Sequence, residues 1–262
     1  MLEKLARVRD RVLDNAVLRE GETLLDVGCG NGLIPFGALE RGAGEVVFAD
    51  ISAPLLDDCR ALAADTGLSD RCRFVEAPAT DLAEIDDGSV DVVTTRSVLI
   101  YVEEKERAFA EFHRVLRPGG RISLFEPINR FGLDERRGTW GFPLEGVDDL
   151  VQKVTAVYDR AQPRADPMLD FDERDLLRLA EDAGFFPIGL EYRAEIERME
   201  ALAWETFLHT AGNPKIPTFA EAMEQALTGD EQKRLLSVLR PAVEDGLGVS
   251  RMATAYLWAV KP

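Results

Sequence analysis

Thr23-Leu24-Leu25-Asp26-Val27-Gly28-Cys29-Gly30-Asn31-Gly32 is the stretch that decides the fold. It starts as an apolar run short enough for a buried strand, and glycine then occupies every second position. A helix-like segment, residues 33–41, follows directly. Glycine is needed where φ is positive or where the backbone must approach a ligand with no Cβ in the way. The order strand, glycine turn and helix therefore predicts a nucleotide-type site at the carboxyl edge of a parallel sheet.

Further short apolar runs alternate with helical patterns downstream. Strand-like runs lie at residues 46–49, 73–77, 90–95 and 121–125, with helical segments at 53–65 and 103–116. The second of these helices should end at Arg117-Pro118-Gly119-Gly120, because proline cannot continue the helical ladder and glycine permits the turn. Strands separated in this way imply βαβ units and a parallel, doubly wound α/β sheet.

The stretch from Asp26 to Gly32 resembles the D-x-G-x-G-x-G signature of class I S-adenosylmethionine-dependent methyltransferases. The segments Asp87-Gly88-Ser89-Val90-Asp91-Val92-Val93 and Arg114-Val115-Leu116-Arg117-Pro118-Gly119-Gly120 are similar to later motifs of the same family. The resemblance covers roughly residues 20–126, and the order and spacing of the motifs are far more specific than a glycine loop alone. It implies a Rossmann-like, mostly parallel seven-stranded sheet ending in an antiparallel hairpin, with S-adenosylmethionine (SAM) as cofactor.

A nucleotide-dependent oxidoreductase is the rival interpretation of the same strand and loop. The dinucleotide fingerprint G-x-G-x-x-G would need a third glycine where Leu33 stands, so the glycine spacing opposes it. Asp50 ends the second strand-like run and is placed to accept hydrogen bonds from ribose hydroxyls. Both classes of enzyme would use that carboxylate, so Asp50 does not separate them.

The resemblance assigns the cofactor contacts residue by residue. The alternate glycines would admit the amino-acid and ribose portions of SAM, Asp26 would help to fix its amino group, and Asp50 would bind the ribose. A structural carboxylate that bonds turn amides is the alternative for Asp26, and a surface ion pair is the alternative for Arg96. The full expected set is Asp26, Gly28, Cys29, Gly30, Gly32, Asp50, Ile51, Ala79, Thr80, Thr95 and Arg96.

The adenine contact departs from the family pattern. The third strand of many such enzymes ends in an aspartate that accepts from the adenine amino group, and Pro78 stands at that place here. Two alternatives remain open. Either Asp81 reaches back to the adenine, or the ring is held by the backbone of Ala79 and Thr80 and by apolar packing.

The second half of the chain has a less regular pattern. We expect a covering helix at residues 1–20, a core at 21–194 and 249–262 with a covering segment at about 127–168, and a helical insertion at 195–248. Within that insertion, residues 195–212, 218–227 and 230–244 look helical. The insertion would act as a lid or a dimer element. Four residues are candidates for contact with the substrate: Tyr101, Trp140, Tyr158 and His209.

Composition narrows the range of partners. A net charge of −17 argues against a nucleic-acid partner, which would need a basic face. No apolar run approaches the roughly 20 residues of a membrane span. Cys29, Cys59 and Cys72 show no C-x-x-C pairing and no metal-ligand spacing, which favours a reducing cytoplasm.

These observations predict a cytoplasmic methyltransferase that acts on a small molecule. An oxygen acceptor is our first expectation, with carbon or nitrogen next, and no residue is identified as a catalytic base. A non-catalytic SAM-binding scaffold protein is the alternative outside enzymes. Cys29 needs only to be small for the loop, and His113 is expected to pack or lie at the surface rather than to act in catalysis. The helical insertion could form the interface of a homodimer.

Overall fold

The computed structural model describes residues 2–136 and 140–262, which fall into two compact units. Unit 1 comprises the chain up to Pro127 together with Glu173–Tyr192 and Thr254–Pro262. Unit 2 comprises Ile128–Asp172 and Arg193–Ala253. None of the helices in the described part of the chain combines the length and the apolar character that a membrane crossing requires.

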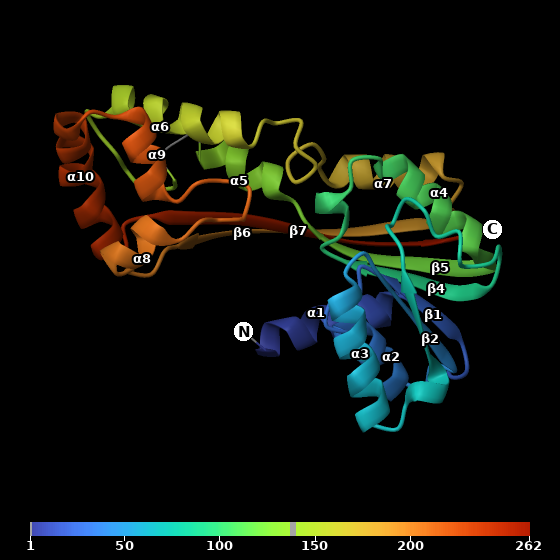
Figure 1. Ribbon diagram of the computed structural model, residues 1–262. Helices are drawn as coiled ribbons and strands as arrows, with labels where there is room; N and C mark the ends of the chain where they lie inside the picture. The colour runs from blue at the N-terminus through green and yellow to red at the C-terminus, as the bar shows by residue number, and fades with distance from the viewer. Residues whose placement is uncertain (1, 137–139) are drawn as a thin grey trace. The chain divides into compact units, whose positions relative to one another are not determined.

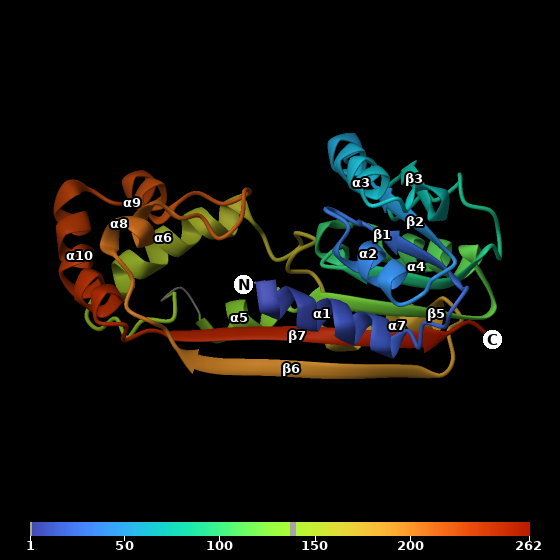
Figure 2. The same cartoon turned by 90° about the horizontal axis from the view of Figure 1, so that it is seen from below.

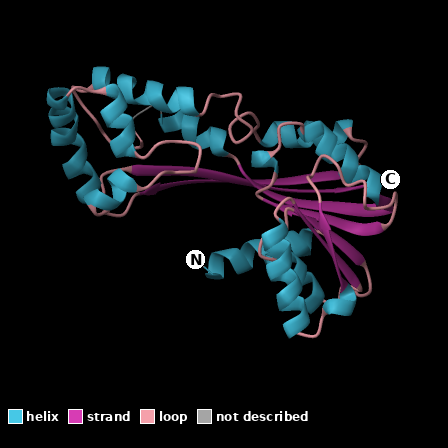
Figure 3. Ribbon diagram, in the orientation of Figure 1, coloured by secondary structure: helices cyan, strands magenta, loops and turns pink. Residues whose placement is uncertain are grey.

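The fold is built on one mixed sheet, whose strands are drawn in magenta in Figure 3 and labelled in part in Figure 1. The order of the strands in the sheet is β3-β2-β1-β4-β5-β7-β6. β1 pairs in parallel with β2 and β4, β2 with β3, and β4 with β5, whereas β5 and β7 are antiparallel. The seven-stranded, mostly parallel, Rossmann-like sheet predicted from the sequence is thereby confirmed. The strands are β1 Thr23–Val27, β2 Glu45–Asp50, β3 Cys72–Glu76, β4 Val90–Arg96, β5 Leu116–Pro127, β6 Ile188–Arg198 and β7 Val249–Val260.

The central strands of unit 1 are buried on both faces, which explains why they are continuous apolar runs in the sequence. Leu24, Phe48 and Val92 belong to one core cluster, which α1 also enters through Val12 and Leu13. α1 packs against α2 and β5, as expected for a helix that covers the sheet (Figure 2). The helices of unit 1 are α1 Leu2–Asn15, α2 Leu33–Glu40, α3 Ala53–Asp65, α4 Lys105–Val115 and α7 Glu173–Asp182, with short 3₁₀ turns η1 Ser69–Arg71 and η2 Leu99–Tyr101.

Unit 2 is helical around an apolar core of its own. α6 packs against α9, and α8 packs against α9 and α10 (Figure 1). Capping boxes formed by Thr218 with Glu221 and by Thr228 with Glu231 fix the starts of α9 and α10. The helices are α5 Asn129–Arg136, α6 Asp148–Ala161, α8 Trp204–His209, α9 Phe219–Ala226 and α10 Gly229–Glu244.

The grouping of segments differs from the expected one. The stretch at 127–168 was expected to cover the core, yet residues 128–172 join residues 193–253 in unit 2; residues 137–139 lie outside the described residues. The reason is apolar complementarity, since Val154 and Val157 of α6 bury their side chains in one cluster with Phe219 and Met223 of α9. Neither segment could bury its apolar face without the other.

The expected helix at 195–212 was wrong over much of its length. Glu195 to Arg198 extend β6, and only Trp204–His209 is helical. Glutamate and arginine are good helix formers, so local propensity favoured a helix. Pairing of β6 with β7 in the sheet overrides that preference.

Candidate cofactor site

A pocket of about 610 Å³ lies in unit 1 at the carboxyl ends of the parallel strands. Ligands of open α/β sheets bind at this edge, so the position is the expected one. Its wall is formed by the loops that follow four strands, β1 to β4. The lining residues are Val27, Gly28, Asp50, Ile51, Ala77, Pro78, Ala79, Thr80, Ser97, Val98, Tyr101, Val102, Glu103 and Glu104.

The glycine loop leaves open space where a ligand needs it. Gly30 has φ +54°, and a Cβ built there would meet no atom within 4 Å. Gly28 has a different task, because a Cβ at that position would lie 2.3 Å from a methyl group of Val98. Gly32 caps α2 and faces the ring of Phe36. The loop thus lets a ligand approach the backbone beside Gly30. At Gly28 it lets the loop after β1 pack closely against Val98 in the loop after β4.

The carboxylate of Asp50 is fixed at the tip of β2. One oxygen accepts the Gly30 N–H at 2.8 Å, and the other accepts the Ser52 N–H at 2.9 Å. Each carboxylate oxygen can accept a second hydrogen bond, so both remain able to accept from a ribose hydroxyl. Asp50 therefore joins the glycine loop of the first strand to the ligand edge of the second.

Six of the expected cofactor residues are absent from the pocket lining in the described structure: Asp26, Cys29, Gly30, Gly32, Thr95 and Arg96. Asp26 is buried and accepts a hydrogen bond of 2.6 Å from the Thr94 hydroxyl. Burial raises the pKa of Asp26 to about 7, although the Thr94 hydrogen bond and the charge of Arg96 lower it. Burial also raises the pKa of the Cys29 thiol, which makes it a poor nucleophile. Thr95 is fully buried, and the residues that follow the β4 strand, Ser97 and Val98, line the pocket instead.

The segment after β3 bears on how adenine would be held. Ala77, Pro78, Ala79 and Thr80 all line the pocket. The carboxylate of Asp81 accepts from the Ala83 N–H at 3.3 Å, and Asp81 is not among the lining residues described. This placement favours the second alternative of the sequence analysis, in which backbone and apolar packing hold the ring.

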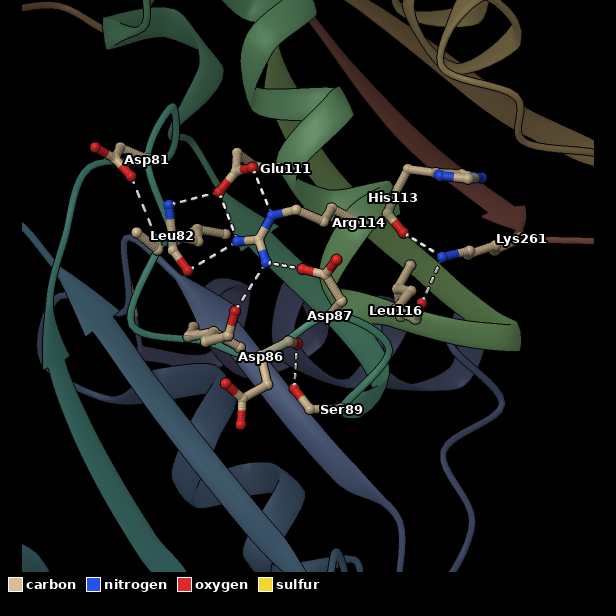
Figure 4. Close-up of polar contacts among 12 residues, drawn as sticks. Asp81, Leu82, Asp86, Asp87, Ser89, Glu111, His113, Arg114, Leu116 and Lys261 are labelled. Atoms are coloured by element: carbon tan, nitrogen blue, oxygen red, sulfur yellow. Dashed lines mark hydrogen bonds and ion pairs between the residues drawn. The ribbon is translucent and has the colours of Figure 1, made fainter.

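Arg114 of α4 anchors the loop that continues from this segment (Figure 4). Its guanidinium donates to the carbonyl oxygens of Leu82 and Ile85, both at 2.9 Å. It also forms ion pairs with Glu111 and Asp87. The motif residue Arg114 therefore fixes the loop that follows the pocket-lining residues Ala77 to Thr80.

The neighbouring His113 takes no part in this network. Its ring packs edge-on against Phe185, with 5.2 Å between the ring centroids. Burial, and then the charge of Lys261, lower the pKa of His113. Its carbonyl oxygen accepts from the ammonium of Lys261 at 2.8 Å (Figure 4). These contacts give His113 a packing role, as expected.

Glu126, at the end of β5, is a site residue that the sequence reasoning missed. It is fully buried, and its Oε1 accepts from the N–H groups of Val98 and Leu99 at 3.0 and 3.1 Å. The Thr95 hydroxyl also donates to Oε1, at 3.3 Å, while Oε2 has no partner in the described structure. Glu126 thereby positions the Val98 wall of the pocket. An acidic residue inside the apolar run Ile122-Ser123-Leu124-Phe125-Glu126 was the signal that could have revealed it.

Burial raises the pKa of Glu126 from its ordinary value of 4.5 to about 7, although the backbone hydrogen bonds lower it. The folded state therefore binds the proton more tightly than the unfolded state, and stability is lost as pH rises from about 4.5 through about 7. Glu126→Gln cannot ionise, so we expect the free energy of unfolding of the variant relative to the wild type to improve by about 3 kcal/mol between pH 5 and pH 8.

Denaturant unfolding at the two pH values measures this difference. Glu106→Gln, on the exposed face of α4, is the matched control and should change nothing. Parallel pH dependence of the wild type and Glu126→Gln would contradict the assignment.

The expected substrate residues fall in different places. Tyr101 lines the unit 1 pocket and is 61% exposed. Trp140 and Tyr158 line a separate cavity within unit 2, with their ring centroids 6.4 Å apart. His209 is exposed, lies 3.5 Å from Glu205, and lines neither cavity in the described structure.

A glycine turn after β1 and a fixed carboxylate at the tip of β2 are typical of nucleoside-binding α/β proteins. The comparisons make this specific, because residues 25–124 match the family model of a methyltransferase domain. The chain belongs to the class I S-adenosylmethionine-dependent methyltransferases. SAM is therefore its cofactor, and the open position beside Gly30 leaves room for such a ligand.

The chain is similar to proteins named ubiquinone/menaquinone biosynthesis C-methyltransferase. It is 38% identical to the one from Hahella chejuensis over 44% of this chain and 46% of that protein. It is 29% identical to the one from Ruegeria sp. over 68% of this chain and 71% of that protein. The matched part thus spans about half the length of the first of these relatives.

A likeness of fold extends over nearly the whole chain. A geranyl diphosphate methyltransferase solved in complex with SAM is 20% identical, with a TM-score of 0.57. The alignment covers 98% of this chain and 85% of that one. At this identity the likeness concerns the fold alone.

Proposed function

We propose that this protein transfers the methyl group of SAM to a small-molecule acceptor, and that carbon is the acceptor atom. The observation that carries the proposal is the pocket of unit 1, which the carboxylate of Asp50 lines while it accepts the N–H of Gly30, a position with open space around its Cα. The lining residues come from the loops after four strands, and this arrangement supports a ligand of nucleoside size. An oxygen acceptor, our first expectation from the sequence, gains no support from relatives named C-methyltransferases.

When bound, SAM presents a methyl group on a positively charged sulfur. The residues of this chain would hold the nucleoside, orient that methyl group and keep water away. Positioning of this kind lowers the activation free energy of a reaction by roughly 7–11 kcal/mol. Asp50 is already engaged with two backbone N–H groups, and Tyr101 is largely exposed, so neither is assigned as a base. An acceptor that is itself nucleophilic at carbon requires no strong base before attack.

The test uses SAM labelled with ¹³C in its methyl group and a panel of small phenols, enols and amines. We expect release of S-adenosylhomocysteine and a new carbon-bound methyl signal in the NMR spectrum of the product. An oxygen-bound or nitrogen-bound methyl signal would contradict the choice of carbon. Binding of SAM with no turnover of any panel member would favour the scaffold alternative.

Tyr101 is proposed to contact the acceptor, because it lies in the same pocket wall as Gly28 and Asp50. Tyr101→Phe should raise KM for the acceptor several-fold and leave the affinity for S-adenosylhomocysteine unchanged. A cytoplasmic location and a homodimer stay predictions of the sequence.

A further inference from the structure

Unit 2 contains a cavity of about 530 Å³ that the SAM site does not use. Its volume falls within the range of roughly 300–1,000 Å³ that small-molecule pockets occupy. Helices α5, α6, α8 and α9 and the loops at 162–169 and 210–217 form its wall. The lining residues are Asn129, Gly132, Leu133, Trp140, Thr155, Tyr158, Asp159, Gln162, Met168, Leu169, Leu202, Phe207, Thr210, Gly212, Asn213, Ile216, Pro217 and Phe219.

The wall is mostly apolar, and three of its aromatic rings, those of Trp140, Phe207 and Phe219, pack together. Trp140 lies edge-on to Phe219 with 4.8 Å between the ring centroids, and Phe207 lies 5.1 Å from Phe219. Lys, Arg and His are absent from the lining in the part of the chain that the structure describes. The single carboxylate of the lining, Asp159, is exposed. An anionic ligand would therefore lose its hydration there without gaining a partner of opposite charge.

Two amide residues of the lining, Gln162 and Asn213, belong to a hydrogen-bond network whose charges are paired. Asn213 donates to Gln162 at 3.2 Å, and Gln162 donates to Asp166 at 3.1 Å. The carboxylate of Asp166 also accepts from the ammonium of Lys215 at 2.8 Å. The positive charge nearest to this wall in the network is thus already neutralised.

Two hydroxyl groups of α6 stand one helical turn apart on the cavity side, at Thr155 and Tyr158. The Thr155 Oγ1 atom is buried and has no hydrogen-bond partner within the described structure. Burial, and then the charge of Glu221, raise the pKa of Tyr158 to about 12, so its hydroxyl remains a donor at neutral pH. A buried hydroxyl without a partner destabilises a protein, and a bound ligand can supply the missing partner.

We propose that the cavity of unit 2 binds an uncharged, largely apolar molecule that carries a hydroxyl or carbonyl group. The aromatic wall receives the apolar body, and Thr155 and Tyr158 recognise the polar group. This is a statement about binding within unit 2, and it does not depend on methyl transfer.

Three probes of matched shape test the proposal: 4-butylphenol, butylbenzene and 4-butylbenzoate. Affinities are measured at pH 7 by ligand-observed NMR, with quenching of tryptophan fluorescence as a second readout. We expect 4-butylphenol to bind at least about 10-fold more tightly than 4-butylbenzoate, which corresponds to about 1.4 kcal/mol. Equal or tighter binding of the benzoate would overturn the choice of an uncharged ligand.

Hydroxyl recognition is tested with Tyr158→Phe and Thr155→Val, which remove one oxygen each and conserve most of the side-chain volume. Both variants should bind 4-butylphenol several-fold more weakly and butylbenzene as tightly as the wild type. Thr206→Val, at an exposed position of α8 outside the lining, is the matched control. Unchanged affinity for 4-butylphenol in both variants, with folding verified by circular dichroism, would overturn the proposal.

The same titrations in the Gly30→Val background separate this proposal from the proposed function. Gly30 belongs to unit 1, so 4-butylphenol should bind as in the wild type even where SAM does not. Loss of probe binding together with loss of SAM binding would place the probe in the cofactor pocket and contradict a site in unit 2.

Discussion

Gly30→Val is expected to lower the affinity for S-adenosylhomocysteine at least about 1,000-fold, which corresponds to about 4 kcal/mol of binding free energy. The space into which a Cβ at this position would project is free of protein atoms within 4 Å, and it opens beside Asp50. A valine there would occupy the place of the ligand. The branched side chain would also be strained at φ +54°. Isothermal titration calorimetry with S-adenosylhomocysteine measures the loss.

Gly67→Val is the matched control for this variant. Gly67 also has positive φ, at +70°, and a Cβ there would likewise meet no atom within 4 Å. It follows α3 and precedes β3, so it lies toward the amino end of that strand, whereas Gly30 follows β1 and bonds the pocket residue Asp50. The control should therefore share the backbone strain and retain the affinity. Equal loss in the two variants would mean that strain, and not exclusion of the ligand, is responsible.

Asp50→Ala is expected to weaken binding of S-adenosylhomocysteine by about 1–3 kcal/mol, which is the usual free-energy cost of leaving a hydrogen-bonding group without its partner. The ribose hydroxyls would lose their acceptor. The N–H groups of Gly30 and Ser52 would lose theirs as well, so the loop would be held less firmly. The same calorimetric titration gives the change in affinity.

Asp70→Ala, at an exposed position of η1, provides the comparison for Asp50→Ala. It removes the same charge from unit 1 without touching the pocket and should leave the affinity unchanged. A second probe sharpens the test, because an analogue of S-adenosylhomocysteine that lacks both ribose hydroxyls should lose less affinity on Asp50→Ala than the parent compound does. A wild-type preference for that analogue as large as for the parent compound would contradict the assigned role.

The sheet could be predicted from the sequence because its signals are local. The run from Leu24 to Val27 is apolar except for Asp26, and the glycines after it mark the turn. Asp50 could be placed at the ligand edge because the carboxyl ends of parallel strands meet there. Its two hydrogen bonds to backbone N–H groups depend on the folded loop and have no local signal.

Unit 2 could not be predicted because its core joins segments that are distant in the chain. The cluster that unites Val154 with Phe219 depends on tertiary packing, which periodicity in either helix does not specify. Glu126 was missed for a similar reason. Its partners, Val98 and Leu99, lie 28 and 27 residues away in sequence, and only strand pairing brings them together.

The pocket residues at the end of β4 could not be identified from the sequence either. The resemblance pointed to Thr95 and Arg96, whereas Ser97 and Val98 line the pocket. Thr95 is a strand residue whose side chain is fully buried and bonds Glu126, so the wall begins two residues later than expected. Which residue at a strand end lines the pocket depends on the face of the sheet toward which its side chain points. A shift of one residue along the strand moves the side chain to the opposite face.

The most direct test of the central claim is a pair of calorimetric titrations of the wild-type protein, one with S-adenosylhomocysteine and one with NADH. The account predicts one-to-one binding of S-adenosylhomocysteine and no heat of binding with NADH. Binding of NADH in the absence of any binding of S-adenosylhomocysteine would contradict it.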